Sequence, residues 1–206
     1  MLASMTDATP ARSRREEYAD ATRAALLATA LQMFTTEGYS AVGIEAIARA
    51  ARVTRGALYH HFADKKALFE ALVIQLQSDA VEKIKSKAKR ATTPRERMRT
   101  GALAFLDACM EPSYRRLVIE EAPAALGTAR CREIEEAHAF GLLIAAVSAQ
   151  QASGAFKTDN AYLAARMVGT MMCEAALLLG DAKRPAEMKR QAVATVERVL
   201  AAFEGE

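Results

Sequence analysis

The chain has 206 residues, 51% of them hydrophobic, and a formal net charge of +3. This length allows one large domain or two small ones around a buried core, and the hydrophobic content excludes a disordered chain. Residues 1–90 carry 14 Lys and Arg against 10 Asp and Glu, whereas residues 91–206 carry 14 against 15. A basic first part favours nucleic-acid binding, although ordinary solvated helix faces give the same balance.

The first expected element is a flexible polar tail over residues 1–19. Its sequence has no apolar core after a basic start, so it does not indicate a secretory signal. An apolar stripe at helical spacing then predicts a helix over Ala21–Glu37, which Gly38 ends.

Two short helices separated by a tight break are predicted next. The segment Val42–Ala51 carries its apolar residues on one face. Thr54 is placed to cap a second short helix, Arg55–His61, in which Leu58 is the buried anchor. Two such helices in succession predict a helix-turn-helix.

The remainder of the chain is also predicted to be helical. Asp64 caps a long helix that runs to about Lys87, and Pro94 marks the boundary with the rear part. The charged run KIKSKAKR before this boundary is interpreted as a solvated helix end. Five further helices are expected over 95–110, 113–125, 128–152, 159–180 and 185–203. Because no segment shows strand alternation, we predict an all-α fold.

The second short helix has the chemistry to enter a DNA major groove. Arg55 can reach guanine acceptors or a phosphate, and Thr54 can bond to either. Ala57 can contact a thymine methyl group, and Gly56 leaves room for a close approach of the DNA. We therefore expect the N-terminal residues of this helix to meet base edges.

Four nearby residues can hold the DNA backbone. Tyr59 and His60 can donate to phosphates, contacts that fix register without reading sequence. Lys65 and Lys66 stand in the first turn of the next helix, where cations oppose the helix dipole. A phosphate bound at that helix terminus would resolve the conflict.

The stretch GYSAVGIEAIARAARVTRGALYHHFADKKALFEAL resembles the DNA-binding domain of the TetR family of bacterial transcriptional regulators. The resemblance runs from about Ala21 to Ala80. It implies a three-helix DNA-binding domain over 20–80, a ligand-binding and dimerisation domain over 81–206, a homodimer, a double-stranded DNA operator and a small-molecule effector. The expected DNA-binding residues are Gly43, Glu45, Arg52, Thr54, Arg55, Gly56, Ala57, Tyr59, His60, His61, Lys65 and Lys66.

The sequence departs from the family pattern at two places. The first helix of the motif commonly opens with Thr or Ser, and here the positions are Val42 and Gly43. The turn usually contains Gly, and here Arg52 stands there. Backbone N–H groups at Gly43 and the Arg52 guanidinium can still meet phosphates. The departures therefore affect individual operator contacts and leave the motif intact.

The last two predicted helices offer apolar surfaces for a dimer. Helix 185–203 has a wide apolar surface, and helix 159–180 mixes large apolar residues with small ones that permit close approach. Burial within one chain accounts for the same pattern. The dimer-interface candidates are Leu163, Met167, Val193, Val196, Leu200 and Phe203.

A ligand pocket is expected among the rear helices. Its candidate residues are Phe105, Cys109, Met110, Leu117, His138, Phe140, Met171, Met172 and Glu174. Methionines suit an adaptable cavity, although they are also common in cores. Glu174 interrupts an apolar run, and it either binds a cationic or hydroxylated ligand or pairs with Arg166 or Arg115. Glu120 and Glu121, beside Arg115 and Arg116, are interpreted as a surface charge network.

Enzymatic and metal-binding functions are not indicated. The sequence has no Gly-rich phosphate loop and no nucleophile elbow, and adjacent His60 and His61 point about 100° apart on a helix. We expect no catalytic residue, cofactor or metal. The three cysteines, Cys109, Cys131 and Cys173, are odd in number and widely spaced, which favours free thiols in a reducing cytoplasm, and the family resemblance implies a bacterial one. No apolar run approaches the roughly 20 residues of a membrane span.

These features predict a ligand-responsive DNA-binding transcriptional regulator. The expected mode is repression, relieved when a small apolar or amphipathic effector releases the protein from a palindromic operator. The alternative is a DNA-binding regulator without a small-molecule effector, either architectural or activating, and a small helical enzyme is a more distant one.

Overall fold

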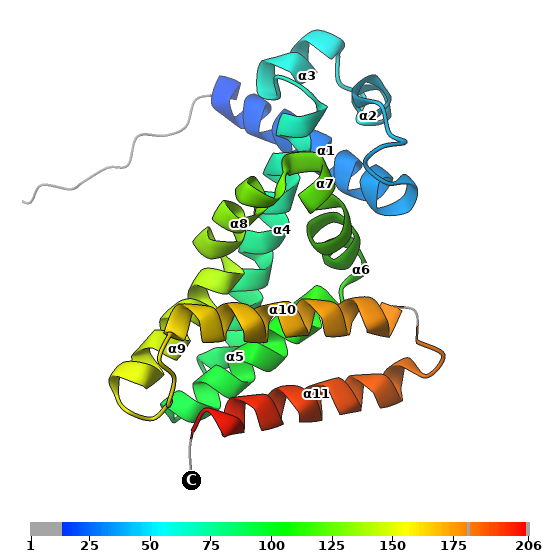
Figure 1. Ribbon diagram of the computed structural model, residues 1–206. Coiled ribbons are helices and arrows are strands. Elements are labelled where there is room, and N and C mark those ends of the chain that lie inside the picture. The colour runs from blue at the N-terminus through cyan, green and yellow to red at the C-terminus, as the bar shows by residue number, and fades with distance from the viewer. Residues whose placement is uncertain (1–13, 181, 205–206) are drawn as a thin grey trace, which may run out of the picture.

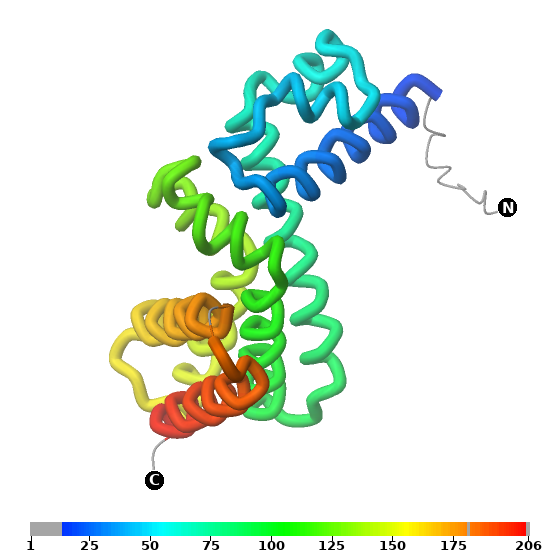
Figure 2. Tube along the Cα trace, turned by 90° about the vertical axis from the view of Figure 1, so that its right-hand side faces the viewer, coloured from blue at the N-terminus to red at the C-terminus, as the bar shows by residue number. Residues whose placement is uncertain are grey.

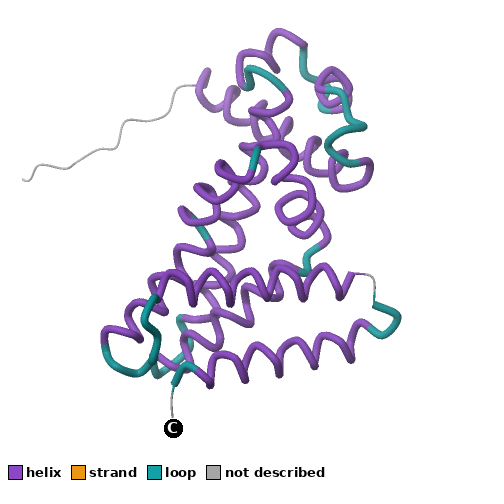
Figure 3. The backbone as a smooth tube through the Cα atoms, viewed as in Figure 1, coloured by secondary structure: helices purple, strands orange, loops and turns teal. Residues whose placement is uncertain are grey.

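The computed structural model describes residues 14–180 and 182–204, and the regular elements in that part of the chain are all helices (Figure 3). The first four are α1 (Arg14–Glu37), α2 (Ile44–Ala50), α3 (Arg55–His61) and α4 (Lys65–Ala88). The others are α5 (Pro94–Cys109), α6 (Pro112–Tyr114), the π-helix η1 (Arg115–Glu121), α7 (Ala122–Leu126), α8 (Thr128–Ala137), α9 (Ala139–Ala152), α10 (Ala161–Gly180) and α11 (Pro185–Ala202). The all-α prediction is confirmed.

Helix α4 connects two groups of helices. Figure 1 shows α1, α2 and α3 at one end of the molecule, here called the head (residues 14–61), and α10 and α11 side by side at the other. Figure 2 shows α4 leaving the head and running into the second group, here called the body (residues 94–204). Its 24 residues span about 36 Å at 1.5 Å per residue. This helix packs on α1 in the head and on α5, α7 and α9 in the body.

An aromatic cluster builds the core of the head. The rings of Phe34 in α1, Tyr39 in the following loop and Phe69 in α4 have centroids 4.5–5.7 Å apart. Phe34 and Phe69 are fully buried. Gly38 ends α1 at a φ of +93°, in the region that favours glycine, and its N–H donates to the Phe34 carbonyl at 2.9 Å. This loop therefore leads the chain from α1 directly over the core towards α2.

The turn between α2 and α3 contains a left-handed residue. Arg52 has a φ of +57° and is the one non-glycine residue with positive φ in the described ranges. This conformation explains why a glycine suits the turn. The Thr54 hydroxyl accepts a hydrogen bond from the Ala57 N–H at 3.2 Å, which is the cap that the sequence predicts. Leu58, 1% exposed, anchors α3 in the head.

The predicted boundaries are wrong at the start of α1. This helix begins at Arg14, so the expected tail over 1–19 is too long, and residues 1–13 lie outside the described part of the chain. The first turns of this helix are polar and have no apolar stripe, so hydrophobic periodicity gave no signal there. Glu16 and Glu17 nevertheless suit a helix N-terminus, because negative charge there is favourable with the helix dipole.

Two predicted body helices are interrupted. The expected helix over 128–152 breaks at His138, whose Nδ1 lies 2.7 Å from the Ile134 carbonyl that a helical N–H would otherwise use. A Cβ on Gly141 would lie 2.1 Å from the Glu136 carbonyl oxygen, so the break depends on this glycine. The helix expected over 113–125 contains η1, just before Pro123, which has no N–H to donate.

Candidate nucleic-acid interface and internal cavity

The outer surface of α3 presents hydrogen-bond donors and, at Gly56, no side chain. Arg55, Gly56, Tyr59 and His60 are exposed, while Leu58 holds the helix from below. A Cβ added to Gly56 would meet nothing within 4 Å, so the backbone there is open to a large bound molecule. A short helix with this exposed face has the shape that a major groove admits.

Glu45 of α2 organises two of these side chains. The Tyr59 hydroxyl donates to Glu45 Oε1 at 3.2 Å, and the Arg55 guanidinium lies 3.7 Å from the same oxygen. The guanidinium also lies over the Tyr59 ring, 5.5 Å from its centroid. An exposed bridge of this kind stabilises by about 1 kcal/mol or less, so it positions both donors and still yields to a phosphate or base.

The two lysines at the start of α4 differ in what they contact. Lys65 is half-buried, and its Nζ donates to the carbonyls of Tyr39 at 2.8 Å and Val42 at 3.0 Å. The same ammonium lies 4.3 Å from the Tyr39 ring centroid. Lys66 is exposed. Lys65 therefore fixes the loop that precedes α2 with two of its three N–H donors, and its contact with DNA stays a prediction.

A clasp formed by Arg116 and Glu121 joins the head to the body. Arg116 Nη1 donates to the carbonyls of Thr35 at 2.7 Å and Thr36 at 3.1 Å, at the C-terminal end of α1. Glu121 accepts from Arg116 Nε at 3.2 Å and from the Tyr39 N–H at 2.8 Å. A cation suits a helix C-terminus, where the last carbonyls lack helical partners. The Arg116–Glu121 part of the predicted surface charge network is therefore a contact between the two parts of the molecule.

Gly38 makes the clasp possible. A Cβ at this position would lie 2.8 Å from Arg116 Nη2 and 3.0 Å from Glu121 Oε1. The glycine is therefore needed for space as well as for its positive φ.

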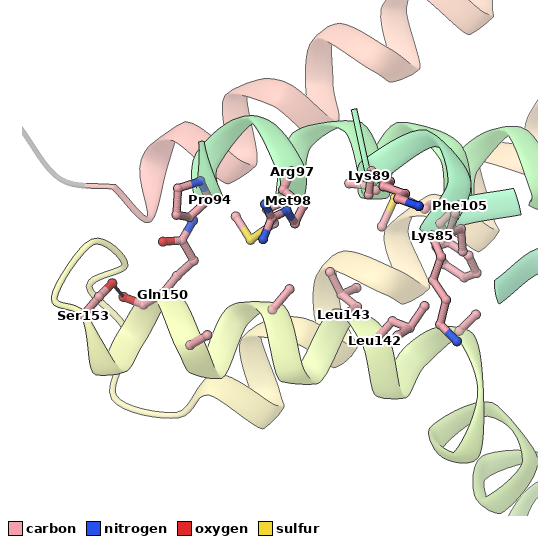
Figure 4. A pocket seen from close by; sticks show the side chains of 18 residues that line it. Lys85, Lys89, Pro94, Arg97, Met98, Phe105, Leu142, Leu143, Gln150 and Ser153 are labelled. Atoms are coloured by element: carbon pink, nitrogen blue, oxygen red, sulfur yellow. Dashed lines mark hydrogen bonds between the residues drawn. The ribbon is translucent and has the colours of Figure 1, made fainter. Parts of the chain in front are cut away.

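The body contains a cavity of about 560 Å³ between α4, α5, α9 and α10 (Figure 4). Its walls are mainly apolar and include Met98, Phe105, Leu142, Leu143 and Met172. Figure 4 shows side chains of α5 and α9 facing each other across it. This volume and this lining are typical of sites for small organic ligands. The polar or charged residues that line it are Lys85, Lys89, Arg97, Gln150 and Ser153.

Two family models match the chain. The model described as "Tetracyclin repressor-like, C-terminal domain" covers residues 95–203, more than half of the chain, and the model described as "Bacterial regulatory proteins, tetR family" covers residues 26–72. The chain belongs to the TetR family. This is a non-enzymatic family of DNA-binding transcriptional regulators, and the two-part fold predicted from the sequence is confirmed.

Curated relatives of this TetR-family protein match it over shorter stretches. The HTH-type transcriptional regulator AcrR of Shigella flexneri is 35% identical over 111 residues, which are 53% of this chain and 51% of that protein. The HTH-type transcriptional activator FasR of Mycolicibacterium smegmatis is 33% identical over 88 residues, 43% of this chain and 40% of that protein. The chain thus spans about half or less of the length of these relatives.

Solved structures match over nearly the whole length. A TetR-family transcriptional regulator from Pectobacterium atrosepticum has a TM-score of 0.73 at 28% identity, covering 95% of this chain and 99% of its own. A second, from Syntrophomonas wolfei, has a TM-score of 0.76 at 15% identity over 88% of this chain and 96% of its own, which shows the fold alone.

Most of the predicted DNA-binding residues of this TetR-family protein are exposed on α2, on α3, in the turns beside them or at the start of α4. The exposed ones are Gly43, Glu45, Arg52, Thr54, Arg55, Gly56, Tyr59, His60 and Lys66. Ala57, His61 and Lys65 are partly buried. Contact of the exposed residues with DNA stays a prediction.

The pocket prediction is corrected for most of its residues. Phe105 and Met172 line the cavity. The residues that do not line it are Cys109, Met110, Leu117, His138, Phe140, Met171 and Glu174. Phe140 packs behind the wall, with its ring centroid 5.6 Å from that of Phe105. Cys109 Sγ lies 4.0 Å from Cys173 Sγ, and this hydrogen bond together with burial raises the pKa of the Cys109 thiol well above its ordinary value.

Glu174 is exposed on α10, and neither of its predicted roles is seen. Arg166 pairs with Glu135 at 2.9 Å, and Arg115 lies 3.6 Å from Glu120. Both arginines thus have other partners, and Glu174 faces away from the cavity because it lies on the outer stripe of its helix.

The dimer candidates divide between outer surface and core. Leu163 and Met167 are 53% and 64% exposed on α10. Val196 and Leu200 are buried within the chain, so these two predictions are corrected, because α11 turns them towards α5 and α10. The other two, Val193 and Phe203, are half-buried, and Phe203 stacks on Phe156.

The expectation that no segment approaches a membrane span in length and apolar character does not hold for α10. It is long and apolar enough to cross a membrane by length and composition alone, a test that core helices also pass. Its inner face packs on α5, α9 and α11.

Two sets of functional candidates were missed at the sequence level. The cavity residues Lys85 and Lys89 are four residues apart, and each directly follows an apolar residue of the inner face, Ile84 or Ala88. This spacing places both lysines at the edge of that face, which is a signal present in the sequence. The clasp residue Arg116 has no comparable local signal, since its partners lie about 80 positions away.

Proposed function

We propose that this protein is a cytoplasmic, homodimeric DNA-binding repressor that a small amphipathic effector releases from a near-palindromic operator. The observation that carries the proposal is the position of α4. Its first residue, Lys65, holds the loop that precedes α2, and its last turns, including Ile84 and Ala88, line the cavity. A single rigid helix therefore links ligand binding to the placement of the helix-turn-helix.

Dimerisation is supported by one stripe of α10. Leu163, Met167, Thr170, Glu174 and Leu178 follow each other at spacings of three or four residues, and all are exposed. Three of them, Leu163, Met167 and Leu178, are large and apolar, and several such residues exposed on one helix face indicate a partner surface more strongly than an isolated one does. In a symmetric dimer the same stripe meets itself. Two heads then reach successive major grooves, roughly 34–36 Å apart or a multiple of this distance.

A pair of lysine variants separates structural from DNA-binding roles in the head. Lys65→Met keeps the apolar stem over Tyr39 but removes the hydrogen bonds to two carbonyls, so we expect the free energy of unfolding to fall by about 1–3 kcal/mol. Lys66→Met should leave stability unchanged, weaken binding to all DNA sequences and lower the salt slope by about one. Chemical denaturation and salt titrations of DNA binding measure both. A reversed pattern would show that Lys65 is the phosphate contact.

A second pair of variants tests the recognition surface. Arg55→Ala should cost about 1–3 kcal/mol of operator affinity and relax base preference, because a guanidinium contacting guanine is lost. Glu45→Gln should strengthen binding up to about fivefold, because it removes a negative charge and releases Arg55. Selection from random DNA followed by affinity titration gives both quantities. If Arg55→Ala kept its base preference, sequence reading would have to lie in other residues.

The effector role is tested by linkage. A ligand that releases the operator hundredfold must itself bind about hundredfold more weakly to the DNA-bound protein. Equal affinity for free and DNA-bound protein would support the alternative of a regulator without an effector. A reporter gene placed under the selected operator shows whether the protein represses or activates transcription, since a repressor's deletion should raise expression of the reporter.

A further inference from the structure

The charged residues that line the cavity are all cations. Lys85 and Lys89 lie one turn apart at the end of α4, and Arg97 lies at the start of α5. No Asp or Glu belongs to the lining that the described residues form. Lys85 pairs with Glu82 at 3.2 Å. Lys89 and Arg97 have no ion-pair partner within 14–180 and 182–204, and both are exposed at the edge of the cavity.

A buried amide indicates where a polar group of a ligand binds. Gln150 of α9 is 7% exposed and lines the cavity. Its backbone carbonyl accepts from the Ser153 hydroxyl, but its side-chain amide has no hydrogen-bond partner in the described part of the chain. Figure 4 shows this side chain pointing from α9 towards Pro94 across the cavity. The amide N and O atoms are accessible from the cavity, so a polar atom of an occupant can pair with them.

We infer that the cavity takes an anionic amphiphile, an apolar chain or ring system that carries a carboxylate. Met98, Phe105 and the leucines of α9 accept the apolar part, and the cations at the edge neutralise the carboxylate. An oxygen of the ligand accepts from the Gln150 amide. Binding of a cationic amphiphile of the same size is disfavoured, because the charged residues of the lining are cations and no carboxylate among them offsets the repulsion. This inference rests on the proposed effector role of the cavity and names the ligand class.

Three probes with the same tail test the charge preference. Full-length protein is titrated calorimetrically, below micelle concentrations, with decanoate, decanol and decyltrimethylammonium. We expect decanoate to bind at least about tenfold more tightly than the other two, with an advantage that shrinks at high salt. Equal or tighter binding of decanol or of the cation overturns the inference and leaves the cavity as an effector site.

Matched variants place the probe in the cavity. Lys89→Glu combined with Arg97→Glu should weaken decanoate about tenfold or more and favour the cation, while Lys83→Glu, on the same helix outside the lining, should change little. Gln150→Leu should weaken decanoate severalfold, and an unchanged affinity would overturn the role assigned to the amide. Ala146→Phe, which fills the cavity, should block all three probes. Binding that survives it, or no binding by any probe to the native protein, contradicts the proposed function itself.

Discussion

Replacing Met167 with Glu is expected to separate the dimer and to abolish tight operator binding. Met167 is 64% exposed on the α10 stripe, between Leu163 and Thr170. In a two-fold interface made by this stripe, the substitution adds two negative charges to those of the two Glu174 copies and buries them without partners. A cost of at least about 3 kcal/mol raises the dimer dissociation constant more than hundredfold. Sedimentation velocity at micromolar concentration measures the change.

The consequence for DNA follows from geometry. Each monomer retains its head, so non-specific binding should persist, whereas simultaneous occupation of two half-sites is lost. Tyr18→Glu is the matched control, since Tyr18 is 75% exposed and lies on α1 far from the stripe. It should leave the protein dimeric. A Met167→Glu protein that remained dimeric would require another interface.

The head could be predicted closely because its signals are local. Thr54 caps α3 through the N–H three residues later, and Gly38 ends α1 through its own φ. Leu58 is apolar in a short polar helix, so its burial follows from that segment alone. Such features depend on neighbours within one or two turns, which a single sequence displays.

The body could be predicted only as helices. The sequence shows that Val196 and Met167 both lie on apolar stripes, but not which stripe faces the same chain and which a partner. The cavity depends on the angle between α5 and α9, and periodicity does not determine this angle. For the same reason Glu174 was expected inside and lies outside.

Contacts between distant segments also explain the missed clasp. Arg116 and Glu121 read as a local charge pair, and their spacing is five residues. Their other partners are the Thr35 carbonyl and the Tyr39 N–H. These are backbone groups, which almost every residue has, so the residue types at these positions do not reveal the contact. An arginine that caps a helix 80 positions away therefore becomes visible only in three dimensions.

The clasp and α4 form two routes from the body to the same loop. Tyr39 is the meeting point, since its N–H donates to Glu121 of η1 and its carbonyl accepts from Lys65 of α4. A ligand that changes the position of α4 relative to η1 therefore acts on the loop that precedes α2. Coupling of this kind requires two arrangements that the ligand distinguishes by free energy.

Arg116→Ala is expected to uncouple the effector from the operator. The variant keeps the recognition surface, so its operator affinity without ligand should stay within about threefold of the native value. A native coupling of about 3 kcal/mol, or hundredfold release, should fall below about tenfold, because motion of η1 no longer pulls on the end of α1. The free energy of unfolding should also fall by about 1.5–3 kcal/mol, since a charged donor to two carbonyls is lost.

Operator affinity is measured with and without saturating decanoate, at a temperature where the variant is folded. Arg132→Ala, at an exposed position on α8, is the control and should retain full release. Full release in Arg116→Ala would show that the coupling does not need the Arg116 contact with α1. Loss of operator binding without ligand would show that the clasp holds the head in its DNA-binding arrangement.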